Sequence, residues 1–204
     1  FVCHLAGVNR TEDDNEFAKV NTDLTNILCD LLVKSGRHLP IIYTSSVHVE
    51  QGNLYGISKL AAEKVLLKYA EKTNAAVYIF RLSHVIGKWC RPNYNSVVAT
   101  FCHNIAHDLP IQINDSDFQL KLVYIDDLIH KFKLIMLGEN NSGPYTEVDP
   151  SYLVSVGELA KIIYAFKESR NTLITERVGE GLIRILYATY ISYLATDSFS
   201  YPLT

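Results

Sequence analysis

Three short, continuous hydrophobic runs stand out along the chain. Phe1 to Ala6 is apolar up to Gly7, and Leu39 to Tyr43 and Ala76 to Phe80 have the same character. Runs of this length without polar alternation are typical of strands buried on both faces, as in a parallel sheet. The polar segment Thr44-Ser45-Ser46 closes the second run.

Two longer segments between these runs have the spacing of helices. The first, Phe17 to Leu32, follows the acidic residues Glu12 to Asp14 and ends before Gly36, and it is apolar at positions 17, 20, 24, 27, 28, 31 and 32. The second, Tyr55 to Lys72, is rich in Leu, Ala, Glu and Lys. Strands alternating with helices predict right-handed βαβ units, and hence an α/β fold with a parallel sheet.

The pattern changes beyond Gly87, where the elements become shorter and more mixed. Ser155 and Glu158 have the spacing of a capping box at a helix start. The other expected elements are a loop at Trp89–Asn95, helices at Val97–His107 and Leu128–Leu137, and a half-exposed strand at Phe118–Tyr124.

Composition narrows the class of protein. The 204 residues are 48% hydrophobic and 20% charged, which is typical of a globular fold. A net charge of −3 offers no basic field for nucleic acid. The uncharged stretch Ile185 to Thr196 is shorter than the roughly 20 residues that span a bilayer, and Phe1-Val2-Cys3-His4 does not resemble a signal peptide. We therefore expect a cytoplasmic protein without a membrane or nucleic-acid partner.

The cysteines and histidines offer one candidate metal site. Cys3, Cys29, Cys90 and Cys102 have no C-x-x-C spacing, so we expect neither disulfides nor a zinc ribbon. In Cys102-His103-x-x-x-His107 the two histidines are four residues apart, but Asn104 stands where a zinc protease motif has Glu. An ordinary helix is the better interpretation, and we expect no metal.

The chemically informative residues are Ser46, Tyr55 and Lys59. Tyr55 and Lys59 are at i, i+4 near a helix start, which places them on one face. The lysine and the helix dipole are expected to lower the pKa of the tyrosine, and Ser46 at the preceding strand end can bind the same substrate oxygen. Although Y-x-x-x-K occurs by chance, a serine at this place favours a device that moves a proton at a carbonyl or carbinol oxygen during hydride transfer.

Several further segments resemble one family, the extended short-chain dehydrogenase/reductases that act on nucleotide sugars. These segments are His4-Leu5-Ala6-Gly7, Asn21, Thr44-Ser45-Ser46, Tyr55-x-x-x-Lys59 with Glu63, Arg81 to Gly87, and Val123 to Asp127. Gly87 to Ser96 and Leu186 to Leu194 are also similar to family members that are reductases of capsular polysaccharide synthesis.

The resemblance implies a role for each matching residue. Tyr55 would be the acid, Lys59 its pKa modifier and a ligand of the nicotinamide ribose, and Ser46 the residue that orients the carbonyl. Asn95 would join Ser46 in binding substrate. The cofactor site would be lined by Leu5, Ala6, Gly7, Asn21, Thr44, Tyr55, Lys59 and His84.

The resemblance also implies an activity and a domain organisation. The activity is NADPH-dependent reduction of a UDP-4-keto-6-deoxy-N-acetylhexosamine by a homodimer, on the route to UDP-N-acetyl-L-fucosamine. The expected fold is a Rossmann-type doubly wound parallel sheet, N-terminally truncated, with residues 1–92 in the NAD(P)-binding domain and residues 93–204 mainly in a smaller C-terminal substrate-binding lobe.

The departures from the family pattern are equally specific. No G-x-G-x-x-G turn is present, His84 stands where the motif has Asn, and Leu120 replaces a diphosphate-binding Arg. We expect an interior fragment, without the first strands and a following cupin domain, that is inactive alone.

Other functions remain open at this point. A nucleotide-sugar 4-epimerase or a dehydratase would share Ser46, Tyr55 and Lys59, although Val47-His48 offers no carboxylate for a dehydratase. A non-catalytic module that binds a sugar nucleotide is the alternative from another class.

Overall fold

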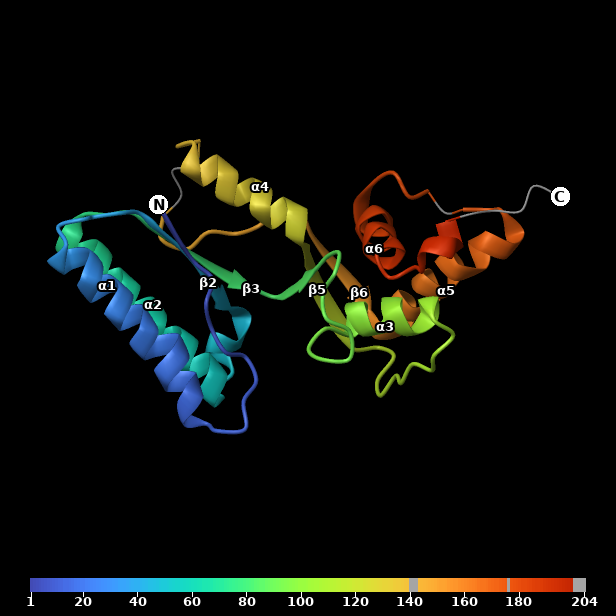
Figure 1. The fold of residues 1–204 in the computed structure, drawn as a ribbon, viewed down its shortest axis with the longest axis horizontal. Helices are drawn as coiled ribbons and strands as arrows, with labels where there is room; N and C mark the ends of the chain where they lie inside the picture. Colours follow the sequence, from blue (N-terminus) through green and yellow to red (C-terminus); the bar gives the residue numbers. More distant parts are fainter. Residues whose placement is uncertain (140–142, 176, 200–204) are drawn as a thin grey trace. The chain divides into compact units, whose positions relative to one another are not determined.

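The computed structural model describes residues 1–139, 143–175 and 177–199 (Figure 1). The chain forms two compact units, Phe1–Ser83 with His130–Val148, and His84–Ile129 with Asp149–Thr204. These units are defined by how the chain packs, whereas the expected boundary between residues 92 and 93 separates a cofactor-binding part from a substrate-binding part. That functional boundary stays a prediction.

The first unit is built on a parallel sheet, as the hydrophobic runs predicted. Its strands are β1 (Val2–His4), β2 (Ile41–Ser46) and β3 (Val77–Leu82), in the order β1-β2-β3. His4 lies opposite Tyr43, and Tyr43 lies opposite Ile79. The α/β, Rossmann-type expectation is confirmed for this part of the fold.

The two long helices also occur where the pattern predicted them. The first begins as a π-helical segment, η1 (Phe17–Asp23), and continues as α1 (Leu24–Lys34). The second is α2 (Leu54–Thr73), preceded by the short 3₁₀ helix η2 (Val47–Glu50). Asn53 caps α2 by accepting a hydrogen bond from the backbone N–H of Gly56 at 2.7 Å.

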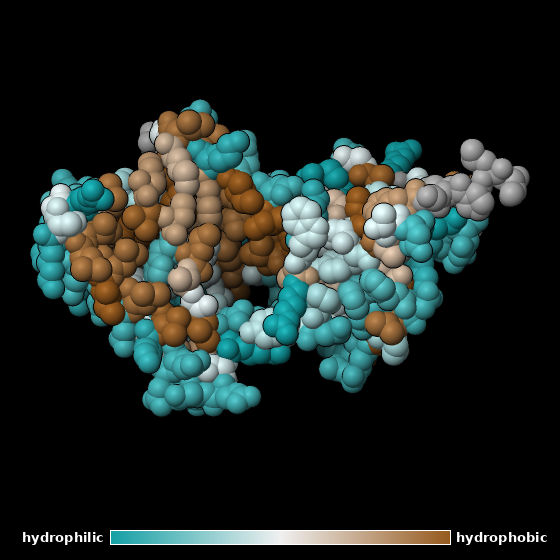
Figure 2. Space-filling model, in the orientation of Figure 1, coloured by the Kyte–Doolittle hydropathy of each residue, from teal (hydrophilic) through white to brown (hydrophobic). Residues whose placement is uncertain are grey.

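The sheet packs on α1 and α2 through a core that includes Ile41, Tyr43, Leu66 and Tyr69. The apolar positions of α1 are divided between two environments. Leu32 and Cys29 are buried, whereas Leu24, Ile27 and Leu31 are 38%, 55% and 59% exposed. Figure 2 shows hydrophobic side chains gathered on the surface of the first unit in this view.

Residues 130–148 also belong to the first unit. They comprise the end of helix α4 (Ile125–Met136) and the segment that follows it. Phe132 packs against Phe80 of β3, with ring centroids 5.0 Å apart. Pro144 and Thr146 bond to Ile79 on β3, since Ile79 N donates to Pro144 O at 2.6 Å and Thr146 N donates to Ile79 O at 2.9 Å. The parallel sheet therefore continues by one short bridge beyond β3.

The second unit has a mixed sheet of β4 (His84–Ile86), β5 (Gln119–Tyr124) and β6 (Ser151–Ser155), with β6 antiparallel to β5. Of these three strands, the sequence patterns predicted only β5. Of the expected capping box, the serine N-cap is confirmed, because Ser155 Oγ accepts from Glu158 N at 3.2 Å. The remaining elements are α3 (Val97–Ala106), α5 (Val156–Thr172), α6 (Gly181–Ile191) and η3 (Thr196–Phe199).

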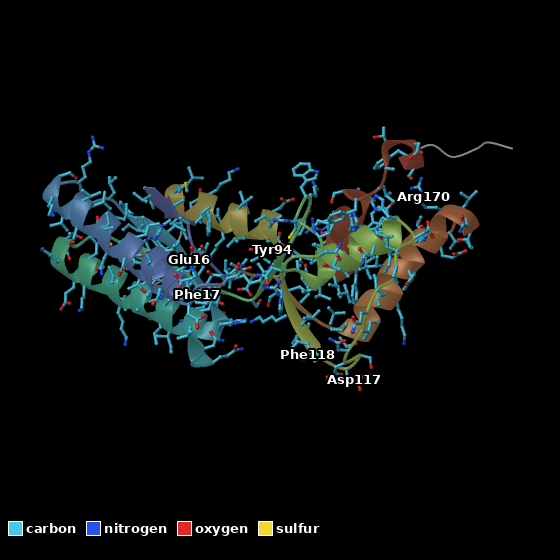
Figure 3. The ribbon with its side chains drawn as sticks, turned by 60° about the horizontal axis from the view of Figure 1, so that its bottom comes forward. Glu16, Phe17, Tyr94, Asp117, Phe118 and Arg170 are labelled. Carbon is cyan, nitrogen blue, oxygen red and sulfur yellow. The ribbon has the colours of Figure 1, made fainter. Side chains whose placement is uncertain are left out.

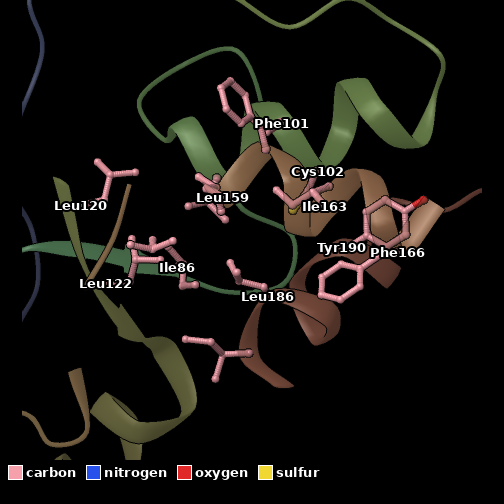
Figure 4. Packing of buried hydrophobic residues seen from close by; sticks show 14 of the residues in the cluster. Ile86, Phe101, Cys102, Leu120, Leu122, Leu159, Ile163, Phe166, Leu186 and Tyr190 are labelled. Carbon is pink, nitrogen blue, oxygen red and sulfur yellow. The ribbon is translucent and has the colours of Figure 1, made fainter. Parts of the chain in front are cut away.

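The core of this unit lies among α3, α5, α6 and the sheet (Figure 4). Cys102 of the metal candidate is 0% exposed and belongs to this core. The rings of His103 and His107 stack on each other, with centroids 4.4 Å apart. In the described part of the chain, no group of three His, Cys, Asp or Glu residues could hold a metal ion. Among the described residues, no helix is both long and apolar enough to cross a membrane.

Two distant segments of the second unit contact each other. The hydroxyl of Tyr193 donates to the carbonyl of Cys90 at 2.5 Å, and the ring of Tyr193 lies 6.1 Å from His103. Trp89 N donates a longer bond to Ser192 Oγ at 3.5 Å. The loop after β4 and the segment after α6 are therefore held together.

Candidate active site

The candidate site lies where the parallel strands of the first unit end. Gly7 follows β1, and Ser46 is the last residue of β2. The carboxyl ends of parallel strands share one edge of a sheet, and this edge is where open α/β folds bind ligands. Ser46, Tyr55 and Lys59 all lie in this unit.

Ser46 and Tyr55 are close enough to interact. Ser46 is 7% exposed, and its Oγ accepts a hydrogen bond from His48 N at 3.2 Å. Tyr55, at the second position of α2, has its ring near those of Phe17 and His48, with centroids 6.1 and 5.8 Å away. Phe17 is labelled at the start of η1 in Figure 3.

The pKa of Tyr55 departs from the expectation. Burial raises the pKa of this phenol above its ordinary value, and a hydrogen-bonding contact with Ser46 lowers it by less. The expected lowering of the Tyr55 pKa by Lys59 is therefore wrong for this structure. The reason is desolvation, which disfavours the phenolate. A protonated phenol remains suited to donate a proton.

Lys59 is buried against the end of β2. Its Nζ donates to the carbonyl of Thr44 at 2.8 Å and lies 4.7 Å from the centre of the Tyr43 ring. The residue is 5% exposed, and burial lowers the pKa of its ammonium to about 8, although the nearby carboxylate of Glu63 acts in the opposite direction. An ammonium has three donors, so two remain for a ligand after Thr44 is bound.

Asn21 holds the loop after β1 in place. Its side chain accepts from Val8 N and donates to Val8 O, both at 2.8 Å, and it donates to Ser58 Oγ at 2.9 Å. Asn21 is 1% exposed, so these bonds connect the loop to α2. Its expected contact with a cofactor stays a prediction.

Gly7 comes very close to both Asn21 and Lys59. A Cβ added at Gly7 would lie 2.9 Å from Asn21 Oδ1 and 3.2 Å from Lys59 Nζ. Leu5, Ala6 and Gly7 are exposed at the end of β1, and Thr44 is half-buried. Of the expected cofactor-lining residues, the structure brings Gly7, Asn21, Thr44 and Lys59 together.

Gly56 fixes the start of α2 against the turn after Ser46. A Cβ at this position would overlap the carbonyl oxygen of His48 and would lie 2.8 Å from its carbonyl carbon. The helix can therefore approach η2 closely enough to bring Tyr55 beside Ser46. This role was not predicted from the sequence, although a glycine directly after the tyrosine was a visible signal.

A buried carboxylate, Glu63, lies one turn after Lys59 on α2. Its side chain is 0% exposed and forms an ion pair with Arg81 of β3 at 2.7 Å. Both residues fall in segments that resemble the family, but their position in the sequence indicated no role for either.

His84 and Asn95 belong to the second unit. His84 is the first residue of β4 and is exposed. Asn95 is exposed in the turn before Ser96, which caps α3. Their expected roles, His84 at the cofactor and Asn95 at the substrate, stay predictions.

The geometry of the first unit corresponds to a known class of nucleotide-dependent enzymes. The chain belongs to the NAD dependent epimerase/dehydratase family, whose model matches residues 1–148.

More specific similarities extend over the whole chain. A UDP-2-acetamido-2,6-beta-L-arabino-hexul-4-ose reductase of Pseudomonas aeruginosa is 53% identical over 203 residues, which are 100% of this chain and 55% of that protein. The crystal structure of the capsular polysaccharide assembling protein CapF from Staphylococcus aureus has a TM-score of 0.88 at 40% identity, over 100% of this chain and 56% of that chain. The chain thus spans about half the length of these relatives.

A more distant structure shares the fold. UDP-glucose 4-epimerase of Thermotoga maritima, in a structure with UDP-glucose, has a TM-score of 0.77 at 19% identity, over 94% of this chain and 76% of that chain. At this identity the similarity concerns the fold alone.

Proposed function

We propose that the protein containing this chain reduces a UDP-4-keto-6-deoxy-N-acetylhexosamine with NADPH, in the synthesis of a surface-polysaccharide precursor such as UDP-N-acetyl-L-fucosamine. The observation that carries this proposal is the clustering of Ser46, Tyr55 and Lys59 at the end of the parallel sheet. The 53% identity to a hexul-4-ose reductase supports the substrate class.

In this proposal each residue acts on the 4-keto group or beside it. When bound, the reduced nicotinamide supplies a hydride to the keto carbon. Tyr55, whose phenol is protonated at neutral pH, donates its proton to the keto oxygen. The Ser46 hydroxyl, beside Tyr55, orients the same oxygen.

The residues around Lys59 suit the nicotinamide-ribose end of a cofactor. Lys59 has donors for ribose hydroxyls, and the missing side chain at Gly7 leaves room for a close approach to Lys59. The lining of the cofactor site would be completed by Leu5, Ala6, Thr44 and His84. Asn21 would support it by holding the loop after β1. The 204 residues contain no Gly-rich turn for the pyrophosphate, so these residues account for one end of the cofactor only.

The substrate proposal rests on the part of the chain after residue 92. Asn95 would contact the nucleotide-diphosphate part of the sugar nucleotide, in line with the resemblance of Gly87 to Ser96. Its exposed position in the turn before α3 leaves it available for this contact.

We also propose that the protein is a homodimer, in which α1 and α2 pair with the same helices of a second copy. Exposed aliphatic side chains on these two helices support the pairing, because Ile27 and Leu31 of α1 and Ile57 of α2 are each more than half exposed. Full burial of an exposed aliphatic side chain is worth about 1.5–3 kcal/mol, so burying the exposed half of each of these would favour association by about 0.8–1.5 kcal/mol.

The test of the reductase proposal is the oxidation of NADPH by the full natural protein in the presence of a UDP-4-keto-6-deoxy-N-acetylhexosamine. Tyr55→Phe should lower kcat by roughly 10²–10⁴, the usual worth of general acid catalysis. Tyr164→Phe, at a tyrosine that is 48% exposed on α5, is the matched control. Turnover by Tyr55→Phe at the unaltered rate would refute the assignment of the acid.

A further inference from the structure

The carboxylate of Glu63 is unusually well bonded for a buried group. Its Oε1 accepts from Ser45 Oγ at 2.5 Å and from Arg81 Nε at 3.1 Å. Its Oε2 accepts from Arg81 Nη2 at 2.7 Å and from the Tyr145 hydroxyl at 3.3 Å. A buried charge is costly unless it is paired and hydrogen-bonded, and here both oxygens are satisfied.

Through Ser45, this carboxylate holds the strand end that carries the candidate catalytic groups. Ser45 lies between Thr44, whose carbonyl accepts from Lys59, and Ser46, which interacts with Tyr55. Fixing the Ser45 side chain against Glu63 therefore fixes the backbone on both sides of it. Glu63 and Lys59 are on the same helix, one turn apart.

Arg81 connects the same carboxylate to two other segments. Its Nη1 lies 3.6 Å from the carboxylate of Glu50, in the turn between Ser46 and Tyr55. Its guanidinium carbon lies 4.6 Å from the centre of the Tyr145 ring. The end of β2, the turn after it, β3 and the bridge around Tyr145 thus all meet at Glu63 and Arg81.

We propose that Glu63, held by Arg81 and Tyr145, is a positioning residue of the candidate active site, which keeps Ser46 and Lys59 in register for proton transfer. The proposal deepens the proposed reductase function and rests on it. Glu63 is placed to act through Ser45 and through its charge, without touching the substrate.

The charge of Glu63 matters because it is the negative charge beside Lys59, whose ammonium otherwise lies over the face of the Tyr43 ring and donates to the Thr44 carbonyl. His4 of β1 repels it when protonated, and burial raises the pKa of the phenols of Tyr43 and Tyr55, which keeps both neutral. The pKa of Lys59 is about 8, with Glu63 the nearby group that raises it. Removing this negative charge would lower the pKa of Lys59 further, so that less of its ammonium would remain at neutral pH.

The test is Glu63→Gln in the full natural protein, compared with Glu71→Gln on the exposed face of the same helix. The amide keeps the shape of the side chain and removes its charge. We expect kcat to fall by about tenfold or more, because small misplacements of reacting groups are costly. We also expect the alkaline limb of the kcat profile, and the pKa of Lys59 measured by NMR of its ¹³Cε, to move to lower pH.

A Glu63 that only stabilises the fold would lower Tm and leave kcat of the folded protein unchanged, and this result would overturn the proposal. If Glu63→Gln does not fold, Ser45→Ala tests the mechanical connection, because Arg81 and Tyr145 still satisfy the carboxylate. An unchanged kcat in Ser45→Ala would then refute the positioning role. The proposed function has a separate test, because the NMR titration of Lys59 does not depend on turnover. A wild-type protein that reduces no UDP-4-keto sugar would refute the proposed function, whatever the titration shows.

Discussion

Replacing Gly56 by Ala tests how closely α2 must approach the turn after Ser46. In a helix, alanine is favoured over glycine by about 1 kcal/mol. Against this gain, the new Cβ would overlap the His48 carbonyl, whose carbon would be 2.8 Å away. Both partners belong to backbone, so the helix start or the turn has to move until the contact exceeds 3.0 Å.

The net effect of Gly56→Ala follows from the contacts that this movement disturbs. Overpacking typically costs about 1–3 kcal/mol. Weakening the Asn53 cap, a 2.7 Å bond to Gly56 N, costs about 1 kcal/mol more. After the helix-propensity gain, we expect a net destabilisation of about 1–3 kcal/mol, which corresponds to a Tm lower by about 3–10 °C.

The measurement is thermal unfolding followed by circular dichroism, together with kcat for the full natural protein. Because Tyr55 directly precedes Gly56, kcat should fall by about 10²-fold if the phenol moves by about 1 Å. Gly179→Ala is the matched control, since a Cβ there meets nothing within 4 Å. A Gly56→Ala protein with a higher Tm and normal kcat would refute the close-approach argument.

Three further outcomes are expected. The pKa of Lys59 is about 8 in the folded chain, against an ordinary value of 10.5 for a lysine, so between these pH values only the unfolded chain holds the proton. The unfolding free energy of the wild type should therefore rise with pH over this window, relative to that of Lys59→Met. Chemical denaturation at several pH values measures this difference, and parallel curves for the two proteins would contradict it. Residues 1–204 alone should bind NADPH only weakly in a fluorescence titration, because they contain no Gly-rich phosphate turn, and micromolar binding would show this reasoning to be wrong. Sedimentation of the full natural protein should show a dimer that Leu31→Glu dissociates, since Leu31 is 59% exposed on α1, and a wild-type monomer at micromolar concentration would refute the proposed homodimer.

The sequence predicted the features of this fold that depend on local rules. The three parallel strands followed from continuous apolar runs, and α2 followed from its composition and length. The proximity of Tyr55 and Lys59 followed from their i, i+4 spacing on that helix. These features need only a few neighbouring residues to specify them.

The features that depend on tertiary contacts were not predictable in the same way. The burial that raises the Tyr55 pKa results from packing around the ring, and it outweighs the local effects that sequence spacing suggested. Tyr145 meets Glu63 across 82 positions in the chain, with no motif to connect them. The π-helical turns of Phe17–Asp23 likewise had no glycine or proline to mark them.

The contacts of Tyr193 with Cys90 and His103 have a consequence for exchanging parts between relatives. Tyr193 and Cys90 are 103 positions apart, yet the loop after β4 and the segment after α6 are each shaped by the other. A chimera whose tail lacks a tyrosine at position 193, or whose loop follows another path, would lose a half-buried phenol–carbonyl bond and leave that carbonyl unsatisfied. The two segments should therefore be transplanted as one module, and natural recombination between them should yield functional descendants less often than recombination outside them.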